Sequence, residues 1–266
     1  MSLNSPPIRL IALDLDGTTI DREQKFSPRV KRAIAQAQRR GVVVTLATGR
    51  SHLAARPFAD ALDIRAPLIC FQGGLVAEPD GRVLHRVVLD RRLAADMLTL
   101  AESRDWHVTL YVQGRLYLSE MRCPPEFYSA LLNPVAQIVP DLRALLARDP
   151  DKLLIIANGN GDAANGDQIL ADLRAHFAGQ AEIVRSHELF IEANPLGVDK
   201  GRGLAWLAEH LRVPQAEVMA IGDHDNDAPM VAWAGLGVAM GNGSRRCQAV
   251  ADWIAPPISQ DGAAWW

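Results

Sequence analysis

The chain has 266 residues, enough for one large domain or two modest ones, and 48% of its residues are hydrophobic, which is ample for a sizeable core. Its net charge of −3 indicates neither a nucleic acid nor an anionic membrane as a partner. No apolar run approaches the roughly 20 residues that span a bilayer, the first residues lack the pattern of a signal peptide, and three widely separated cysteines are typical of a reduced, cytoplasmic chain.

The first 80 residues alternate short apolar runs with amphipathic ones. Strands are predicted at 8–16, 42–49 and 66–74, and helices between them at 27–41 and 50–63. The first helix has Ser27 as its N-cap, Pro28 in its first turn and Gly41 just beyond its end. Continuously apolar strands that alternate with helices predict a parallel sheet with helices on both faces.

A different pattern occupies about residues 83–193, where hairpins and helices mix. The predicted elements are a hairpin that turns at Asp80-Gly81, a helix over 90–105, two strands joined near Gly114, a strand from 151, a helix that ends at Gly179 and a strand pair over 181–193. Strands and helices alternate again over 197–241. We therefore expect an α/β protein with a Rossmann-like parallel-sheet core, residues 1–82 and 194–266, interrupted by an inserted α+β domain, residues 83–193.

Two aspartates follow the first predicted strand. Asp14 and Asp16 share a face in an extended chain, and two like charges this close indicate a cation that neutralises them. Oxygen ligands suit Mg²⁺, and an aspartate can also attack phosphorus and form an aspartyl-phosphate. A solvated turn without chemistry is the alternative for this pair.

Two further groups could bind a phosphate. Thr48 and Gly49 end the second strand and offer a hydroxyl and a backbone N–H, although Thr48 could instead be a helix N-cap. Lys200 stands at a predicted helix start, where the helix dipole does not favour a cation. A phosphate nearby would explain Lys200, and an ordinary solvent-facing lysine is the alternative.

The segment IGDHDNDAPM places three aspartates directly after the strand predicted over 216–223. Capping of the next helix needs one of Asp223, Asp225 and Asp227 rather than all three, so a metal site is favoured. Each of these four groups is predicted at the carboxyl end of a buried parallel strand, where open α/β sheets bind their ligands.

In chain order, the groups are Asp-x-Asp, then Thr, then Lys, then Gly-Asp-x-x-Asn-Asp. This pattern resembles the haloacid dehalogenase-like hydrolase superfamily, and most closely the Cof-type phosphatases with a large α/β cap. The resemblance covers nearly the whole chain, because the insertion follows the third strand, where this class places its cap. The tail from GLGVAMGNGS to APPISQDG is also similar.

The resemblance implies a Mg²⁺-dependent phosphatase that acts on a small phosphorylated metabolite, such as a sugar phosphate, in the cytoplasm. Asp14 would be the nucleophile, and Asp16 the general acid and then the base for the hydrolytic water. The phosphate would be bound by Thr48, Gly49, Lys200 and Asn226, and Mg²⁺ by Asp14, the backbone carbonyl of Asp16, Asp223 and, through its waters, Asp227.

Two positions depart from the family pattern. Gln72 stands where Asn is common, near the expected cap hinge, so contacts with the substrate there are not predicted. His224 stands where a smaller polar residue is usual, and we expect it to be a surface histidine rather than a ligand.

Two other functions use similar residues. A sugar phosphomutase on a related fold would rebind its phosphorylated intermediate instead of releasing phosphate to water. A phospho-receiver signalling module also uses Asp, Thr, Lys and Mg²⁺ on a parallel sheet, but it is shorter and has no cap insertion. The sequence identifies neither the substrate nor the oligomeric state.

Overall fold

The computed structural model describes residues 6–132, 136–157, 165–187 and 189–265. The chain forms two compact units, which are described separately here. Unit 1 comprises Met1–Gly49, Ala55–His85 and Asp199–Trp266, and unit 2 comprises Arg50–Ala54 and Arg86–Val198. The roles of catalytic core and cap that the sequence suggests for 1–82 with 194–266 and for 83–193 remain predictions.

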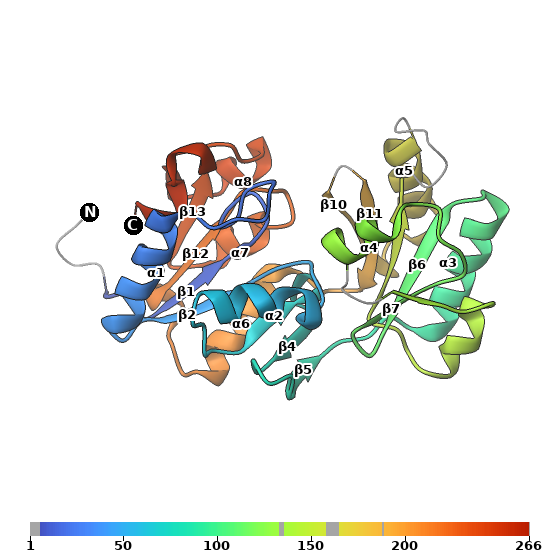
Figure 1. The fold of residues 1–266 in the computed structure, drawn as a ribbon, viewed down its shortest axis with the longest axis horizontal. Helices are drawn as coiled ribbons and strands as arrows, with labels where there is room; N and C mark the ends of the chain where they lie inside the picture. The colour runs from blue at the N-terminus through green and yellow to red at the C-terminus, as the bar shows by residue number, and fades with distance from the viewer. Residues whose placement is uncertain (1–5, 133–135, 158–164, 188, 266) are drawn as a thin grey trace. The chain divides into compact units, whose positions relative to one another are not determined.

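A five-stranded parallel sheet forms the centre of unit 1 (Figure 1). In spatial order its strands are β14 (Trp253–Ala255), β13 (Leu236–Met240), β12 (Val218–Gly222), β1 (Leu10–Leu13) and β2 (Val43–Leu46). β1 pairs in parallel with β12 on one side and with β2 on the other. Every residue of β1 and β12 is buried, as expected for parallel strands that helices cover on both faces.

Helices pack on the two faces of this sheet. They are α1 (Pro28–Arg39), α6 (Lys200–His210), α7 (Ala228–Trp233) and α8 (Arg245–Ala249). Another helix, α2 (His52–Ala61), follows β2 in the chain. Leu204 of α6 and Met230 of α7 share a buried core with Ala12 of β1. α1 lies along the opposite side of the sheet (Figure 1), because the crossovers from β1 to β2 and from β12 to β13 run in opposite directions.

The third predicted strand has a different partner from the one expected. β3 (Leu68–Cys70) touches β2 through an isolated parallel bridge between Ala47 and Ile69. Its strand partner is β4 (Leu75–Ala77), which runs antiparallel to it and is followed by β5 (Val83–Arg86) in a three-stranded sheet. The cause is a 3-10 turn over Phe71–Gly73, which sends the chain straight back along β3.

Unit 2 contains a six-stranded sheet. In spatial order its strands are β10 (Ala181–His187), β11 (Phe190–Pro195), β9 (Lys152–Ile156), β6 (His107–Val112), β7 (Arg115–Leu118) and β8 (Ala136–Ile138). All neighbours are antiparallel except β7 and β8. The helices are α3 (Arg91–Ser103), α4 (Pro125–Leu131) and α5 (Asn165–Phe177).

One face of this second sheet carries the core of unit 2. Leu98 of α3 and Leu173 of α5 pack there with Leu110 and Leu153 of the sheet. The order of helices and antiparallel strands confirms the predicted α+β character of the inserted region. Residues 120–150 contain α4, β8 and a 3-10 segment.

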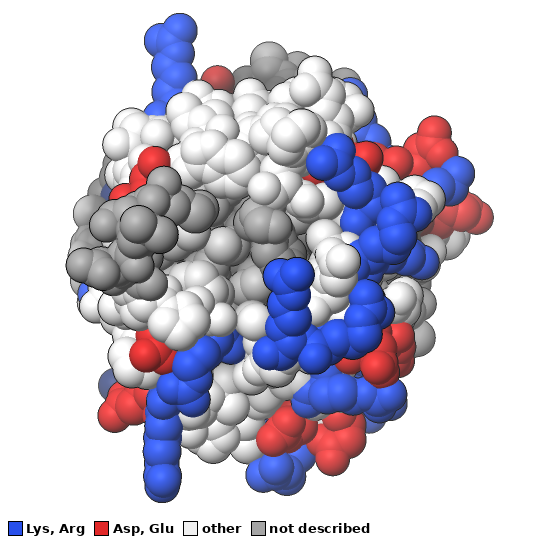
Figure 2. All heavy atoms as spheres, turned by 90° about the vertical axis from the view of Figure 1, so that its left-hand side faces the viewer, with Lys and Arg blue, Asp and Glu red and all other residues white. Residues whose placement is uncertain are grey.

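The predicted α/β class is confirmed, with a parallel-sheet core and an additional, mainly antiparallel sheet. Within the described parts of the chain, no helix combines the length and the apolar character that crossing a membrane requires. Figure 2 looks onto the left-hand side of Figure 1 and shows Lys and Arg side chains with Asp and Glu side chains beside them. Charges of both signs therefore share this face, in keeping with the small net charge.

Candidate active site

The polar residues that the sequence singles out lie at one edge of the parallel sheet of unit 1. Asp14 follows β1, Thr48 follows β2 and Asp223 follows β12. All three side chains are buried. Because the strands are parallel, their carboxyl ends meet at this edge, where open α/β sheets bind their ligands.

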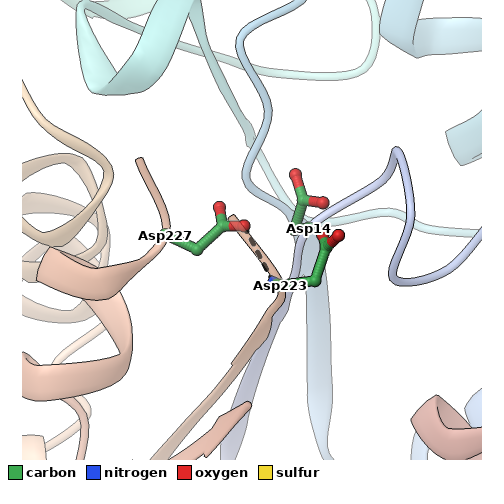
Figure 3. A group of neighbouring side chains, drawn as sticks. All are labelled: Asp14, Asp223 and Asp227. Carbon is green, nitrogen blue, oxygen red and sulfur yellow. Dashed lines mark hydrogen bonds between the residues drawn. The ribbon is translucent and has the colours of Figure 1, made fainter. Parts of the chain in front are cut away.

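Three carboxylates form the centre of the site (Figure 3). Asp14, Asp223 and Asp227 each offer an oxygen, and these oxygens lie within 4.8 Å of one another. Burial, and after it the charge of Asp227, raises the pKa of Asp14 well above its usual range. Like charges gathered in a buried place are stable only with positive charge beside them.

Lys200 supplies one such charge. Its side chain is 1% exposed, and Nζ lies 2.6 Å from Asp14 Oδ1 and 2.5 Å from Asp227 Oδ1. Burial lowers the pKa of Lys200, but the two carboxylates raise it by more, so the pKa lies above its ordinary value and the amine is protonated. Lys200 does begin a helix, α6, as predicted, and the alternative of a solvent-facing lysine is wrong. Its predicted place at the end of a parallel strand is also wrong, because the strand before α6 is the antiparallel β11.

Asp227 fixes the loop that follows β12. Its Oδ2 accepts the backbone N–H groups of Asp223, at 3.0 Å, and of His224, at 2.9 Å. Gly222 leaves the space for this arrangement, since a Cβ atom there would lie 2.4 Å from the Cβ of Asp227. Both oxygens of Asp227 thus have partners within the protein, and this residue orients the backbone that carries Asp223.

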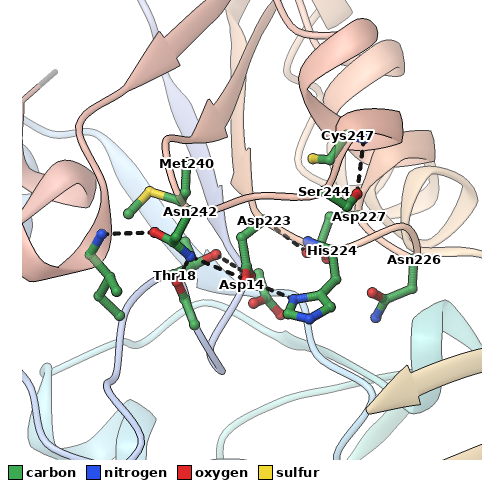
Figure 4. Close-up of polar contacts among 12 residues, drawn as sticks. Asp14, Thr18, Asp223, His224, Asn226, Asp227, Met240, Asn242, Ser244 and Cys247 are labelled. Atoms are coloured by element: carbon green, nitrogen blue, oxygen red, sulfur yellow. Dashed lines mark hydrogen bonds and ion pairs between the residues drawn. The ribbon is translucent and has the colours of Figure 1, made fainter. Parts of the chain in front are cut away.

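Several polar groups surround the Asp223 carboxylate (Figure 4). Thr18 Oγ1 donates to Asp223 Oδ1 at 2.9 Å, and Asn242 Nδ2 lies 3.4 Å from Oδ2. His224 Nδ1 lies 2.7 Å from the same Oδ2, and this hydrogen bond raises the pKa of His224 to about 9. The ring of His224 is on the surface, 58% exposed, but it also contacts the site, which the sequence analysis did not anticipate.

Asp16 and Asp225 lie outside the group of three carboxylates. Both residues are exposed. General acid and base chemistry requires a group within hydrogen-bond reach of the proton that it transfers. That role, and the predicted use of its backbone carbonyl as a metal ligand, remain predictions.

The predicted phosphate ligands Thr48, Gly49 and Asn226 meet around Gln72. The backbone N–H of Gln72 donates to the carbonyl of Thr48 at 3.1 Å, and Asn226 Nδ2 donates to Gln72 Oε1 at 3.0 Å. The end of the Gln72 side chain lies against Gly49, where a Cβ atom would be 2.4 Å from Nε2.

Thr48 is not the N-cap of the helix that follows it. α2 begins at His52, and Ser51 Oγ accepts the N–H of Ala54 at 3.3 Å. The capping alternative for Thr48 is therefore wrong, and phosphate binding by Thr48 and Gly49 remains a prediction.

Thr18, Asn242 and Gln72 are the residues of this site that the sequence analysis gave no role. Thr18 belongs to the same Asp-x-Asp-Gly-Thr run as Asp14. Asn242 follows β13, so a polar residue after a fourth buried strand was the available signal. Gln72 follows β3, so the same signal was available there, and the sequence analysis singled Gln72 out only as a departure from the family pattern.

The donor set suits a hard divalent cation. All three clustered side chains are carboxylates; Lys200 contacts Asp14 and Asp227, and His224 contacts Asp223. Mg²⁺ prefers oxygen ligands and usually takes one or two carboxylates together with waters and phosphate oxygens. Asp14 and Asp223 would bind such an ion directly, and it would offset the repulsion that raises the pKa of Asp14.

Known proteins are similar to this chain over nearly its whole length. A profile described as haloacid dehalogenase-like hydrolase matches residues 11–266. The chain is 28% identical to phosphatase YwpJ of Bacillus subtilis, covering 97% of this chain and 98% of that protein. It is 32% identical to the HMP-PP phosphatase of Serratia proteamaculans, covering 88% and 84%. A crystal structure of a haloacid dehalogenase-like hydrolase from Bacteroides thetaiotaomicron matches with a TM-score of 0.84, at 27% identity and 97% coverage of both chains.

Proposed function

Because the chain belongs to the haloacid dehalogenase-like hydrolase family, we propose that it is a Mg²⁺-dependent phosphatase that hydrolyses a small phosphorylated metabolite through a phosphorylated Asp14. The observation that carries this proposal is the buried group of Asp14, Asp223, Asp227 and Lys200 at the carboxyl ends of parallel strands. In this group Asp14 is the candidate nucleophile, Lys200 supplies positive charge, and the carboxylates are candidate metal ligands.

In the first step, a carboxylate oxygen of Asp14 attacks phosphorus, and the bond between phosphorus and the alcohol oxygen breaks. Asp16 gives its proton to the leaving oxygen, so that the product leaves as a neutral alcohol. Lys200 stabilises the negative charge of the phosphoryl oxygens, and Thr48, Gly49 and Asn226 offer hydrogen-bond donors that hold the group in line with Asp14.

In the second step, Asp16 accepts a proton from water as the water oxygen attacks the phosphorylated Asp14. The bond between phosphorus and the Asp14 oxygen breaks, which releases inorganic phosphate and restores the carboxylate. When bound, Mg²⁺ would neutralise charge on the phosphoryl oxygens and keep Asp14 ionised. Over the two steps Asp16 gives up one proton and regains one, and Asp14 returns to its free carboxylate.

Unit 2 is proposed as the cap that selects the substrate, and a large cap favours small molecules over proteins. The HMP-PP phosphatase of S. proteamaculans acts, by its name, on a small phosphorylated compound, which supports this size class. A sugar phosphate or a similar phosphomonoester is the proposed substrate. A cytoplasmic location is part of the proposal, and the three unpaired cysteines Cys70, Cys123 and Cys247 support it.

The test measures release of inorganic phosphate from p-nitrophenyl phosphate and from a panel of sugar phosphates, with Mg²⁺ and without an acceptor sugar. We expect hydrolysis by the natural protein and a loss of at least about 10³-fold in Asp14→Asn, which removes the nucleophile. Asp96→Asn is the matched control, since Asp96 is an exposed aspartate of α3.

Two results would contradict the proposal. Near-normal hydrolysis by Asp14→Asn would rule out a mechanism through a phosphorylated Asp14. Isomerisation of a sugar phosphate without net release of phosphate would instead indicate a mutase.

A further inference from the structure

The turn after β3 has an unusual backbone. Phe71 and Gln72 both adopt left-handed conformations, with φ of 49° and 58°, and Gly73 follows with φ of 100°. A left-handed conformation costs a non-glycine residue about 1–2 kcal/mol, so it persists where the surroundings determine it strongly. Gln72 is only 3% exposed, and its surroundings are therefore the place to look for a reason.

This turn touches each of the three segments that carry the proposed phosphate ligands. The N–H of Gln72 donates to the carbonyl of Thr48. The side chain of Gln72 accepts from Asn226. Gly73 packs closely on Asp199, the residue before Lys200. A Cβ atom added to Gly73 would lie 2.2 Å from the carbonyl oxygen of Asp199.

The hydrogen bond between Gln72 and Asn226 fixes the orientation of one amide. Gln72 Oε1 can only accept, so it turns the –NH₂ group of Asn226 toward itself, at 3.0 Å. The Asn226 –NH₂ has a second hydrogen, which can donate to a phosphate oxygen. Asn226 Oδ1 is buried and makes no hydrogen bond within the described structure, so Gln72 is the side-chain group that orients this amide.

We propose that Gln72 is a positioning residue of the phosphate site, which holds the Asn226 amide and the Thr48–Gly49 backbone in the arrangement that binds the phosphoryl group. This inference rests on the proposed function. Gln72 acts through Asn226 and Gly49 and need not touch the substrate. The length of its side chain is part of the argument, since it reaches Asn226 with one end of the amide while the other end lies against Gly49.

The test is a double-mutant cycle read by binding of inorganic phosphate in the presence of Mg²⁺. Calorimetry gives the Kd of phosphate for the natural protein, Gln72→Met, Asn226→Ala and the double variant, and it needs no catalytic activity. We expect Gln72→Met to raise this Kd about 3–10-fold, the worth of one hydrogen bond. In the Asn226→Ala background the same substitution should change it by less than about twofold, because the group that Gln72 orients is absent.

Gln113→Met is the matched control. Gln113 also has a left-handed backbone, with φ of 53°, but it is exposed on the turn between β6 and β7. Gln72→Asn, which keeps the amide and shortens the side chain by one methylene, is a second variant should Gln72→Met fold poorly, and it should also raise the Kd. Thermal unfolding checks the fold of each protein.

An equal effect of Gln72→Met in both backgrounds, or an unchanged Kd in a folded Gln72 variant, would overturn the inference. Failure of the proposed function looks different. In that case the natural protein would hydrolyse no phosphomonoester and Asp14→Asn would make no difference.

Discussion

Lys200 and Asp14 show how far single residues could be understood before the structure was seen. The order of the motifs and the family resemblance predicted a shared site, and the structure places Lys200 Nζ 2.6 Å from Asp14 Oδ1. Gln72 could not be understood in this way. Its partner Asn226 lies 154 positions away, and no motif in the sequence pairs these two side chains.

His107 in unit 2 provides a buried group whose charge state follows from its hydrogen bonds. Tyr128 Oη accepts the N–H groups of Arg122 and Cys123, both at 3.0 Å, so it donates its own proton to His107 Nε2, 2.7 Å away. That nitrogen must be unprotonated. In agreement, burial and then the charge of Arg122 lower the pKa of His107 from 6.5 to about 4.

This shift predicts a pH-dependent stability. The unfolded chain binds the proton more tightly, so the contribution of His107 is complete above pH 6.5 and is lost as the pH falls toward 4. Between pH 7.5 and 5 the loss is about 2 kcal/mol. We expect His107→Phe to lose correspondingly less stability over this range, measured by urea unfolding at both pH values.

The exposed His176 of α5 supplies the comparison for this prediction. His176→Phe should retain the pH dependence of the natural protein. If His107→Phe shows the same pH dependence as the natural protein, the buried histidine is not the source of the acid sensitivity.

Among the elements, α1 was predicted closely and β3 was not. Ser27 Oγ accepts the N–H of Val30 at 3.1 Å, and Gly41 has a left-handed φ of 81°, so both predicted ends of α1 are confirmed. Such signals are local. The pairing of β3 depends on the turn at Phe71–Gly73, whose left-handed residues include two that are not glycine and therefore give no turn signal.

The turn after β1 allows a prediction about the position of Asp223. Gly17 has φ of 86°, and a Cβ atom there would lie 2.5 Å from Asp223 Oδ2. Gly17→Ala should therefore displace a proposed metal ligand and lower kcat/KM by more than about tenfold, since misplaced groups at a reaction centre cost this much or more. The measurement is steady-state hydrolysis of p-nitrophenyl phosphate over a range of Mg²⁺ concentrations.

Gly41→Ala is the control for Gly17→Ala, because it introduces the same backbone strain without displacing a side chain. Gly41 also has a positive φ, 81°, but a Cβ atom there would meet nothing within 4 Å. This variant should lose about 1 kcal/mol of stability and keep its activity. Equal kinetic effects of the two substitutions would show that Asp223 is not displaced.

At the scale of the whole molecule, the resemblance to the haloacid dehalogenase-like hydrolases is confirmed by a family match over 11–266. A phospho-receiver module does not fit a match of this length. The order of the motifs was sufficient for this conclusion, because four short patterns in register are far more specific than each alone. The substrate was not predictable, since no motif in the sequence identifies the side chains that would select it.

Metal binding should distinguish the two units. Asp14, Asp223 and Asp227 all belong to unit 1, so Mg²⁺ should stabilise unit 1 more than unit 2. At 100 times its Kd, a ligand adds about 2.7 kcal/mol. Hydrogen exchange of peptides from β1 and β12, compared with β6 and β9, measures this difference in metal-free and Mg²⁺-loaded protein.

Asp223→Asn should abolish the response to Mg²⁺, and a sodium salt at the same ionic strength should produce none in the natural protein. Equal added protection in β1 and β6 would contradict a site confined to unit 1.

The boundaries between the two units have a thermodynamic consequence. The chain leaves unit 1 directly after Gly49, and it finally returns at Asp199, the residue before Lys200. Two of the proposed phosphate ligands therefore border the joints between the units. If a torsional change at either joint moves a ligand, binding of phosphate biases the conformation of the joint, and the joint biases binding by the same factor.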